Sequence, residues 1–163
     1  MLETGVTEAK TVARETFPFD IPYSERSLAI ACTRGRHAVV SHFTDLLKDA
    51  GLTEQQWRVI RIISDFAPLS LNELSQKSCI HKVSMTRIVR ALTERELIYT
   101  EKDPDDLRSF KASLTPSGKD FVENLRPKSE KIAQGIIGHF GEENATQLLH
   151  LLNMLSQLND NGR

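Results

Sequence analysis

The sequence predicts a mainly α-helical protein with one small β-hairpin, and three observations support this prediction. Apolar residues recur at the three- and four-residue spacing of amphipathic helices along most of the chain after residue 24. One short segment, residues 97–114, instead places strand-forming residues on both sides of a charged turn. Hydrophobic residues make up 39% of the 163 residues, which is enough for a packed core.

The first 24 residues are expected to form an N-terminal arm outside the main domain. They show little apolar periodicity, and Pro18 and Pro22 exclude a regular helix over residues 17–23. Two interpretations remain open. The arm is either a disordered tail or a segment that packs its aromatic residues on a partner subunit.

Three helices are expected next. Helical apolar spacing runs from Leu28 to Ala50 and stops at Gly51. Thr53 and Gln56 form the pattern of a capping box, which begins a second helix that ends before a proline at position 68. Another capping box, formed by residues 70 and 73, begins a short third helix with its leucines facing inward.

A fourth helix is expected from about Lys82 to Arg95 after a break at residues 79–81. Its apolar face comprises Met85, Ile88, Val89 and Leu92. The opposite face is polar and carries arginines. Two short helices joined by a turn, with one face of the second left free, are typical of a helix-turn-helix that enters a DNA major groove.

The hairpin comprises strands near residues 97–102 and 110–114, joined by the charged turn 103–109. Thr115 and Pro116 then predict the start of a long helix that reaches about Phe140 and is kinked at Pro127. Gly141 separates it from a last helix. That helix carries an apolar stripe too extensive for an exposed terminal helix: Leu148, Leu151, Leu152, Leu155 and Leu158.

Basic residues concentrate on the fourth helix, although the net charge of the whole chain is only −1. Residues 82–95 include four basic residues and only one acidic residue. Arginine binds guanine edges and phosphates, and hydroxyl groups bind both bases and phosphates. The candidate DNA-binding residues of this helix are Lys82, Ser84, Thr86, Arg87 and Arg90. A solvated charged face on an ordinary helix is the alternative.

The turn of the hairpin adds a second candidate DNA contact. An arginine at a hairpin tip can enter the narrow, negatively charged minor groove. Arg108 lies in this turn, and Asp106 is placed to hold its guanidinium in position. Directly after a helix-turn-helix, the hairpin is therefore better interpreted as a DNA-binding wing than as a solvated turn.

These residues resemble those of a known family. The run from residue 103 to Gly118, with Asp106, Arg108, Leu114 and Thr115, is similar to the wing signature of the MarR family of bacterial regulators. The positions of Ser84, Thr86 and Leu92 also match its recognition helix. Residues 52–58 resemble the branch that regulates homoprotocatechuate degradation. The resemblance spans about residues 28–158, with departures at Leu107, Ala112 and Glu96. The family frequently has glycine at the position of Glu96. Because this chain has glutamate there, a left-handed backbone is not expected at that residue.

The resemblance implies a homodimeric winged helix-turn-helix regulator. Its MarR-type domain would cover residues 25–163, with a winged lobe at about 53–115 and dimerisation helices at about 25–50 and 116–160. The partner would be double-stranded DNA carrying an inverted-repeat operator, from which a small aromatic acid releases a repressor. The resemblance and side-chain chemistry together give the candidate ligand-binding residues Arg36, His37, Ser41, Trp57 and Arg61. Core packing of Trp57 and a surface salt bridge of Arg36 are alternatives.

Three other functions were compared with this one. A thiol-based redox sensor on the same fold would use Cys32, although we favour an inert, buried cysteine there. A winged-helix protein-interaction module would not bind DNA. An enzyme is not expected, because no phosphate loop, zinc motif or nucleophile elbow is present. No metal, cofactor or membrane span is expected, and the two separated cysteines favour a reduced cytoplasmic setting.

Overall fold

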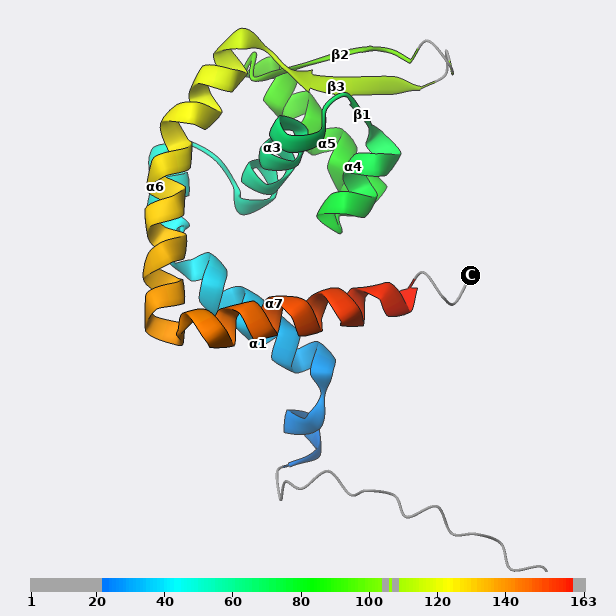
Figure 1. Ribbon diagram of the computed structural model, residues 1–163. Coiled ribbons are helices and arrows are strands. Elements are labelled where there is room, and N and C mark those ends of the chain that lie inside the picture. The colour runs from blue at the N-terminus through cyan, green and yellow to red at the C-terminus, as the bar shows by residue number, and fades with distance from the viewer. Residues whose placement is uncertain (1–21, 104–105, 107–108, 160–163) are drawn as a thin grey trace, which may run out of the picture. The chain divides into compact units, whose positions relative to one another are not determined.

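The computed structural model describes residues 22–103, 106 and 109–159 (Figure 1). The chain divides into two compact units, Met1–Arg36 and His37–Arg163, and each is described by itself. The first unit contains the 3-10 helix η1 (Tyr23–Arg26) and most of helix α1 (Leu28–Ser41). The predicted arm lies almost entirely outside the described residues, so its two interpretations stay open.

In the second unit, the chain turns at His42 and Phe43 between α1 and a short helix α2 (Thr44–Asp49). The prediction of one continuous helix over residues 28–50 was therefore wrong. The turn follows from packing, because Phe43 and Leu46 contact the core and Leu47 is buried within it. Gly51 follows α2 with a φ of +63°, as a helix-stopping glycine should.

Both predicted capping boxes are present at helices α3 (Glu54–Phe66) and α4 (Leu71–Ser78). The Thr53 hydroxyl accepts from the Gln56 amide at 3.2 Å, and the Gln56 side chain accepts from the Thr53 amide at 2.9 Å. Helix α5 (Lys82–Glu94) buries the four apolar residues that the sequence assigned to its inner face. The helix-turn-helix prediction is confirmed.

The predicted hairpin consists of β2 (Ile98–Lys102) and β3 (Phe110–Leu114), paired antiparallel with Ile98 opposite Leu114. A third strand, β1 (Leu69–Ser70), pairs with the other edge of β3, giving the order β1-β3-β2. The sequence did not predict β1, because two residues are too few to show an alternating pattern. The core lies among α3, α4, α5 and this sheet, and its largest fully buried side chains include Ile60, Ile63, Leu74, Met85, Leu92 and Ile98.

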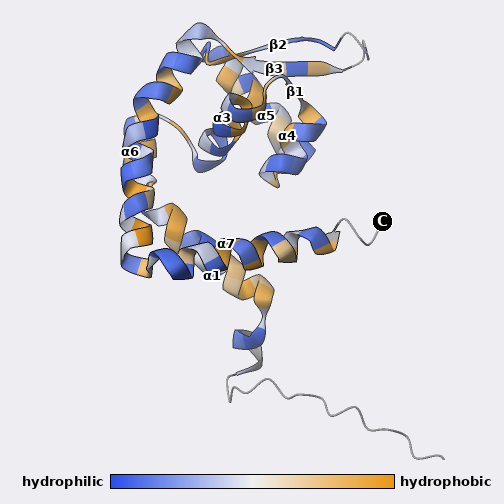
Figure 2. Ribbon diagram, in the orientation of Figure 1, coloured by the Kyte–Doolittle hydropathy of each residue, from blue (hydrophilic) through white to orange (hydrophobic). Residues whose placement is uncertain are grey.

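Helices α6 (Pro116–Phe140) and α7 (Glu142–Ser156) follow, with the 3-10 helix η2 (Gln157–Asn159) after them. Pro127 lies inside α6. Apolar residues recur along α7 (Figure 2), and several large ones are exposed in the single chain: Leu148, Leu149, Leu151, Leu152 and Met154 in α7, and Leu158 in η2. None of the helices in the described part of the chain is both long and apolar enough to span a membrane.

The end of α5 is joined tightly to the start of α6. Glu96 has a φ of +56°, so the expectation that this position would avoid the left-handed region was wrong. The conformation presents the Glu96 carbonyl to the hydroxyls of Thr115 and Ser117, which donate to it at 2.6 and 2.8 Å. At Gly118, a Cβ atom would lie 1.9 Å from the Leu97 carbonyl oxygen, so only glycine permits this approach.

Candidate DNA-binding surface and ligand pocket

The outer face of α5 presents most of the predicted DNA-binding residues. Lys82, Thr86, Arg87 and Arg90 are exposed, and Ser84 is half-buried. Val83 is 73% exposed on the same helix, where an apolar side chain is able to contact a thymine methyl group. The sequence analysis assigned no role to Val83.

Two of these side chains make local contacts. The Thr86 hydroxyl donates to the Lys82 carbonyl at 3.1 Å and keeps its acceptor lone pairs. The Arg90 guanidinium lies 3.5 Å from the Glu94 carboxylate, and both side chains are more than two-thirds exposed, at 77% and 68%. An exposed ion pair of this kind is weak, so a DNA phosphate would readily replace the carboxylate.

Arg95 has a different role from the other basic residues of this segment. Its guanidinium donates to the carbonyls of Gly51 at 2.7 Å and Ala50 at 3.1 Å, and lies 5.7 Å from the ring centre of Phe121. Arg95 therefore connects the end of α5 to the end of α2 and to α6. It was counted in the basic cluster, but it stabilises the position of α5 within the lobe.

The hairpin is closed by an ion pair that the sequence did not reveal. Asp103 is 8% exposed, and its carboxylate lies 3.1 Å from the Lys111 ammonium. The Asp103 amide also donates to the Ser109 carbonyl at 3.0 Å. Asp106 is exposed at the tip. Arg108 lies outside the described residues, and so does its expected contact with Asp106.

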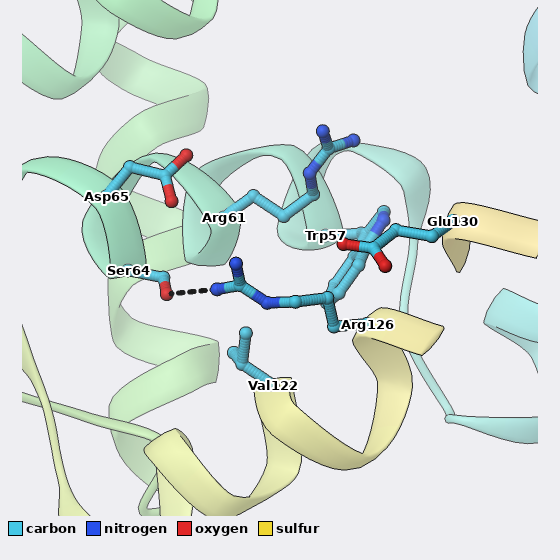
Figure 3. Close-up of a pocket in the computed structure, with 7 residues that line it drawn as sticks. All are labelled: Trp57, Arg61, Ser64, Asp65, Val122, Arg126 and Glu130. Atoms are coloured by element: carbon cyan, nitrogen blue, oxygen red, sulfur yellow. Dashed lines mark hydrogen bonds between the residues drawn. The ribbon is translucent and has the colours of Figure 1, made fainter. Parts of the chain in front are cut away.

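A pocket lies between α3 and α6 (Figure 3). Its volume is about 100 Å³, and its lining comes from one face of each helix: Trp57, Arg61, Ser64 and Asp65 from α3, and Val122, Arg126 and Glu130 from α6. Trp57 also belongs to the hydrophobic core, so core packing and pocket lining coexist at this residue. Its side chain is only 5% exposed, and its indole Nε1 has no hydrogen-bond partner among the described residues.

The polar side chains of the pocket make only weak interactions with one another. Arg126 donates to the Ser64 hydroxyl at 3.4 Å, which is long for such a bond. The Arg61 guanidinium lies 5.9 Å from the Trp57 ring centre. Within the described chain, neither arginine forms an ion pair with Asp65 or Glu130.

The structure brings together two of the five predicted ligand-binding residues, Trp57 and Arg61. Arg36 belongs to the first unit, whereas this pocket lies within the second. His37 and Ser41 are exposed in the second unit and do not line it. The three α6 residues were missed, although their spacing of four residues in a predicted helix places them on one face.

Cys32 is exposed in the first unit, so the expectation of a buried cysteine was wrong for the single chain. No group of histidine, cysteine or carboxylate side chains suited to a metal ion is found among the residues with described positions.

Comparison with known proteins extends these observations. Residues 52–110 match the MarR family. The homoprotocatechuate degradative operon repressor of Escherichia coli is 32% identical over 126 residues, which cover 77% of this chain and 85% of the relative. This chain belongs to the MarR family. It is a winged helix-turn-helix, DNA-binding transcription regulator, and the family's members are regulators rather than enzymes.

Solved MarR-family structures are similar in fold. Transcriptional regulator PA4135 is 37% identical, with a TM-score of 0.77 over 80% of this chain and 96% of that one. NadR in complex with 4-hydroxyphenylacetate is 27% identical, with a TM-score of 0.75 over 85% of this chain and 99% of NadR.

Proposed function

We propose that this MarR-family protein is a homodimeric repressor that binds an inverted-repeat operator and releases it when a small aromatic carboxylic acid binds. The observation that carries the acid response is the pocket in which a buried indole and two arginines lie between α3 and α6. Two similar proteins support the same interpretation. The E. coli relative is named as a repressor, and NadR is known in complex with 4-hydroxyphenylacetate.

DNA recognition is assigned to α5 and the hairpin. Lys82, Ser84, Thr86, Arg87 and Arg90 would contact bases and phosphates in the major groove. Arg108 would enter the minor groove, held by Asp106. The neutral balance of the whole chain makes this local basic face the source of attraction for DNA.

Dimerisation is assigned to the terminal helices. The domain layout is an arm at residues 1–24, dimerisation helices at about 25–50 and 116–160, and a winged lobe at about 53–115. The exposed leucines of α7 require an apolar cover, and a second copy supplies one through two-fold symmetry. A two-fold dimer matches an inverted repeat whose half-sites lie about one helical turn apart. A monomer at micromolar concentration in sedimentation would contradict this assignment.

The acid is assigned to a site that includes Arg36, His37, Ser41, Trp57 and Arg61. Arg36 would bind the carboxylate, and Trp57 would form a flat wall against the ring. The ligand loosens DNA only if it binds the DNA-incompatible conformer more tightly. A typical coupling between two such sites weakens operator binding roughly 5- to 150-fold.

The test is a titration of phenylacetate-, benzoate- and cinnamate-type acids against the complex of the protein with its footprinted operator. At least one acid should weaken the complex, and Arg36→Ala should keep the DNA affinity while losing the response. If peroxide weakens the complex, the acids do not and Cys32→Ser abolishes the effect, the protein is a redox sensor instead. If DNA binding shows no salt dependence or sequence preference, the protein-interaction alternative is favoured.

A further inference from the structure

Helix α6 contributes a cationic side chain to the pocket that the proposed site did not include. Figure 3 shows the Arg126 side chain extending from α6 toward Ser64 on α3, while the guanidinium of Arg61 points away from Ser64. The Arg126–Ser64 hydrogen bond, at 3.4 Å, is the interaction that closes this part of the pocket. A hydroxyl oxygen is a poor substitute for an anion as the partner of a guanidinium.

Hydrogen-bond donors of the pocket have either no acceptor or only a weak one. Trp57 is 5% exposed, and its indole N–H has no acceptor within the described chain. Arg126 has only the Ser64 hydroxyl oxygen as an acceptor, and the Ser64 hydroxyl can still donate its own proton to a ligand. A buried donor without an acceptor, such as the Trp57 indole N–H, is rare in folded proteins and calls for a specific explanation. A ligand carboxylate beside Ser64 would accept from the guanidinium and from the hydroxyl.

The remaining lining residues limit the shape and the charge of the rest of the ligand. Val122 is 3% exposed and, with the Trp57 ring, provides an apolar wall for an aromatic or aliphatic body. Asp65 and Glu130 are exposed at the same pocket and balance the two arginines in formal charge. The lining therefore suits a ligand with a single negative charge, because a second one would meet these carboxylates.

We infer that Arg126 is a specificity-determining residue of the effector site. Its guanidinium, together with the Ser64 hydroxyl, binds the carboxylate of a monocarboxylic acid. This inference rests on the proposed function and adds an anchor on α6 to the residues proposed for the site. On binding, the acid replaces the Ser64 hydroxyl as the partner of Arg126. The effector is thereby held by α3 and α6 together.

The experiment compares an acid with its neutral amide. The probes are 4-hydroxyphenylacetate and 4-hydroxyphenylacetamide, and binding is followed by the fluorescence of Trp57, the single tryptophan of the chain. Wild type is expected to prefer the acid. Arg126→Ala should weaken acid binding roughly 10- to 100-fold, as expected for loss of a charge-assisted bond, and leave amide binding nearly unchanged. Lys128→Ala, an exposed α6 residue outside the pocket, is the matched control and should behave like wild type.

The outcomes separate the inference from the function on which it rests. Equal loss of acid and amide binding in Arg126→Ala would show a structural role and overturn the inference. An unchanged acid affinity in that variant, with operator release intact, would overturn the inference and leave the proposed function standing. If wild type binds none of the phenylacetate-, benzoate- and cinnamate-type acids, both fall. Arg126→Gln serves as the second variant if the alanine variant does not fold, with the same loss of acid preference expected.

Discussion

Replacing Glu96 with glycine should stabilise the protein, because this residue has a left-handed backbone at the end of α5. Its φ is +56°, a conformation that costs an ordinary L-residue roughly 1–2 kcal/mol. Glycine avoids that cost but has more backbone freedom to lose on folding, which offsets roughly 0.5–1 kcal/mol. The hydrogen bonds that Glu96 accepts from Thr115 and Ser117 use its backbone carbonyl and are retained in the variant. The net expectation for Glu96→Gly is a gain of about 0.5–1 kcal/mol.

The gain is measurable by urea and thermal unfolding, where about 1 kcal/mol corresponds to a shift of roughly 2–4 °C for a chain of this size. Protein concentration must be the same in all samples, since the stability of the proposed dimer would depend on it. Glu96→Ala is the control, because it removes the exposed carboxylate and keeps the Cβ atom in the left-handed region. If the alanine variant is as stable as the glycine variant, or if glycine destabilises, the argument from backbone strain is refuted.

Three further predictions concern packing, pH and DNA. Gly118→Ala should destabilise by more than about 2 kcal/mol in urea unfolding, because its Cβ would meet the Leu97 carbonyl at 1.9 Å, whereas Gly135→Ala in the same helix meets nothing within 4 Å. The backbone and side-chain hydrogen bonds from Ser70 lower the pKa of Glu73. The stability that these bonds contribute is therefore fully present above the ordinary glutamate pKa, and it is lost as the pH falls through the lowered pKa of the folded protein. Between about pH 7 and pH 3, wild type should therefore lose more stability than Glu73→Gln, and equal losses would contradict this. Arg87→Ala should cost ~1–3 kcal/mol and relax specificity at one base, whereas Arg90→Ala should weaken all sequences and flatten the salt slope by about one unit, as binding titrations over operator variants and salt would show.

Local signals in the sequence were sufficient to predict the helix-turn-helix and the β2–β3 hairpin. The two capping boxes mark helix starts through contacts between residues three apart, and these contacts are present. The inner face of α5 follows from helical periodicity alone. The turn at His42 and Phe43 was missed because it depends on where the core lies, which apolar spacing within one segment does not reveal.

The pocket was only partly predictable, for a related reason. Trp57 and Arg61 lie one turn apart on α3, so their shared face could be inferred from the sequence. Arg126 lies 62 residues from its partner Ser64, and no local pattern connects them. Likewise, the ion pair of the buried Asp103 with Lys111 requires the register of β2 against β3, which the charged composition of the turn concealed.

Helix α6 contacts both the segment that follows α5 and the candidate ligand pocket. Its first turn holds the residues after α5, through the Ser117 hydroxyl on the Glu96 carbonyl and the close approach of Gly118 to Leu97. Within the next three turns it places Phe121 beside Arg95 and Arg126 in the pocket. A ligand that alters the spacing of α3 and α6 would therefore act on a helix that also contacts residues 95–97, directly after α5. If the effector binds there as proposed, α6 offers a route from Arg126 to the end of α5, because packed interfaces shift between discrete arrangements rather than deforming smoothly.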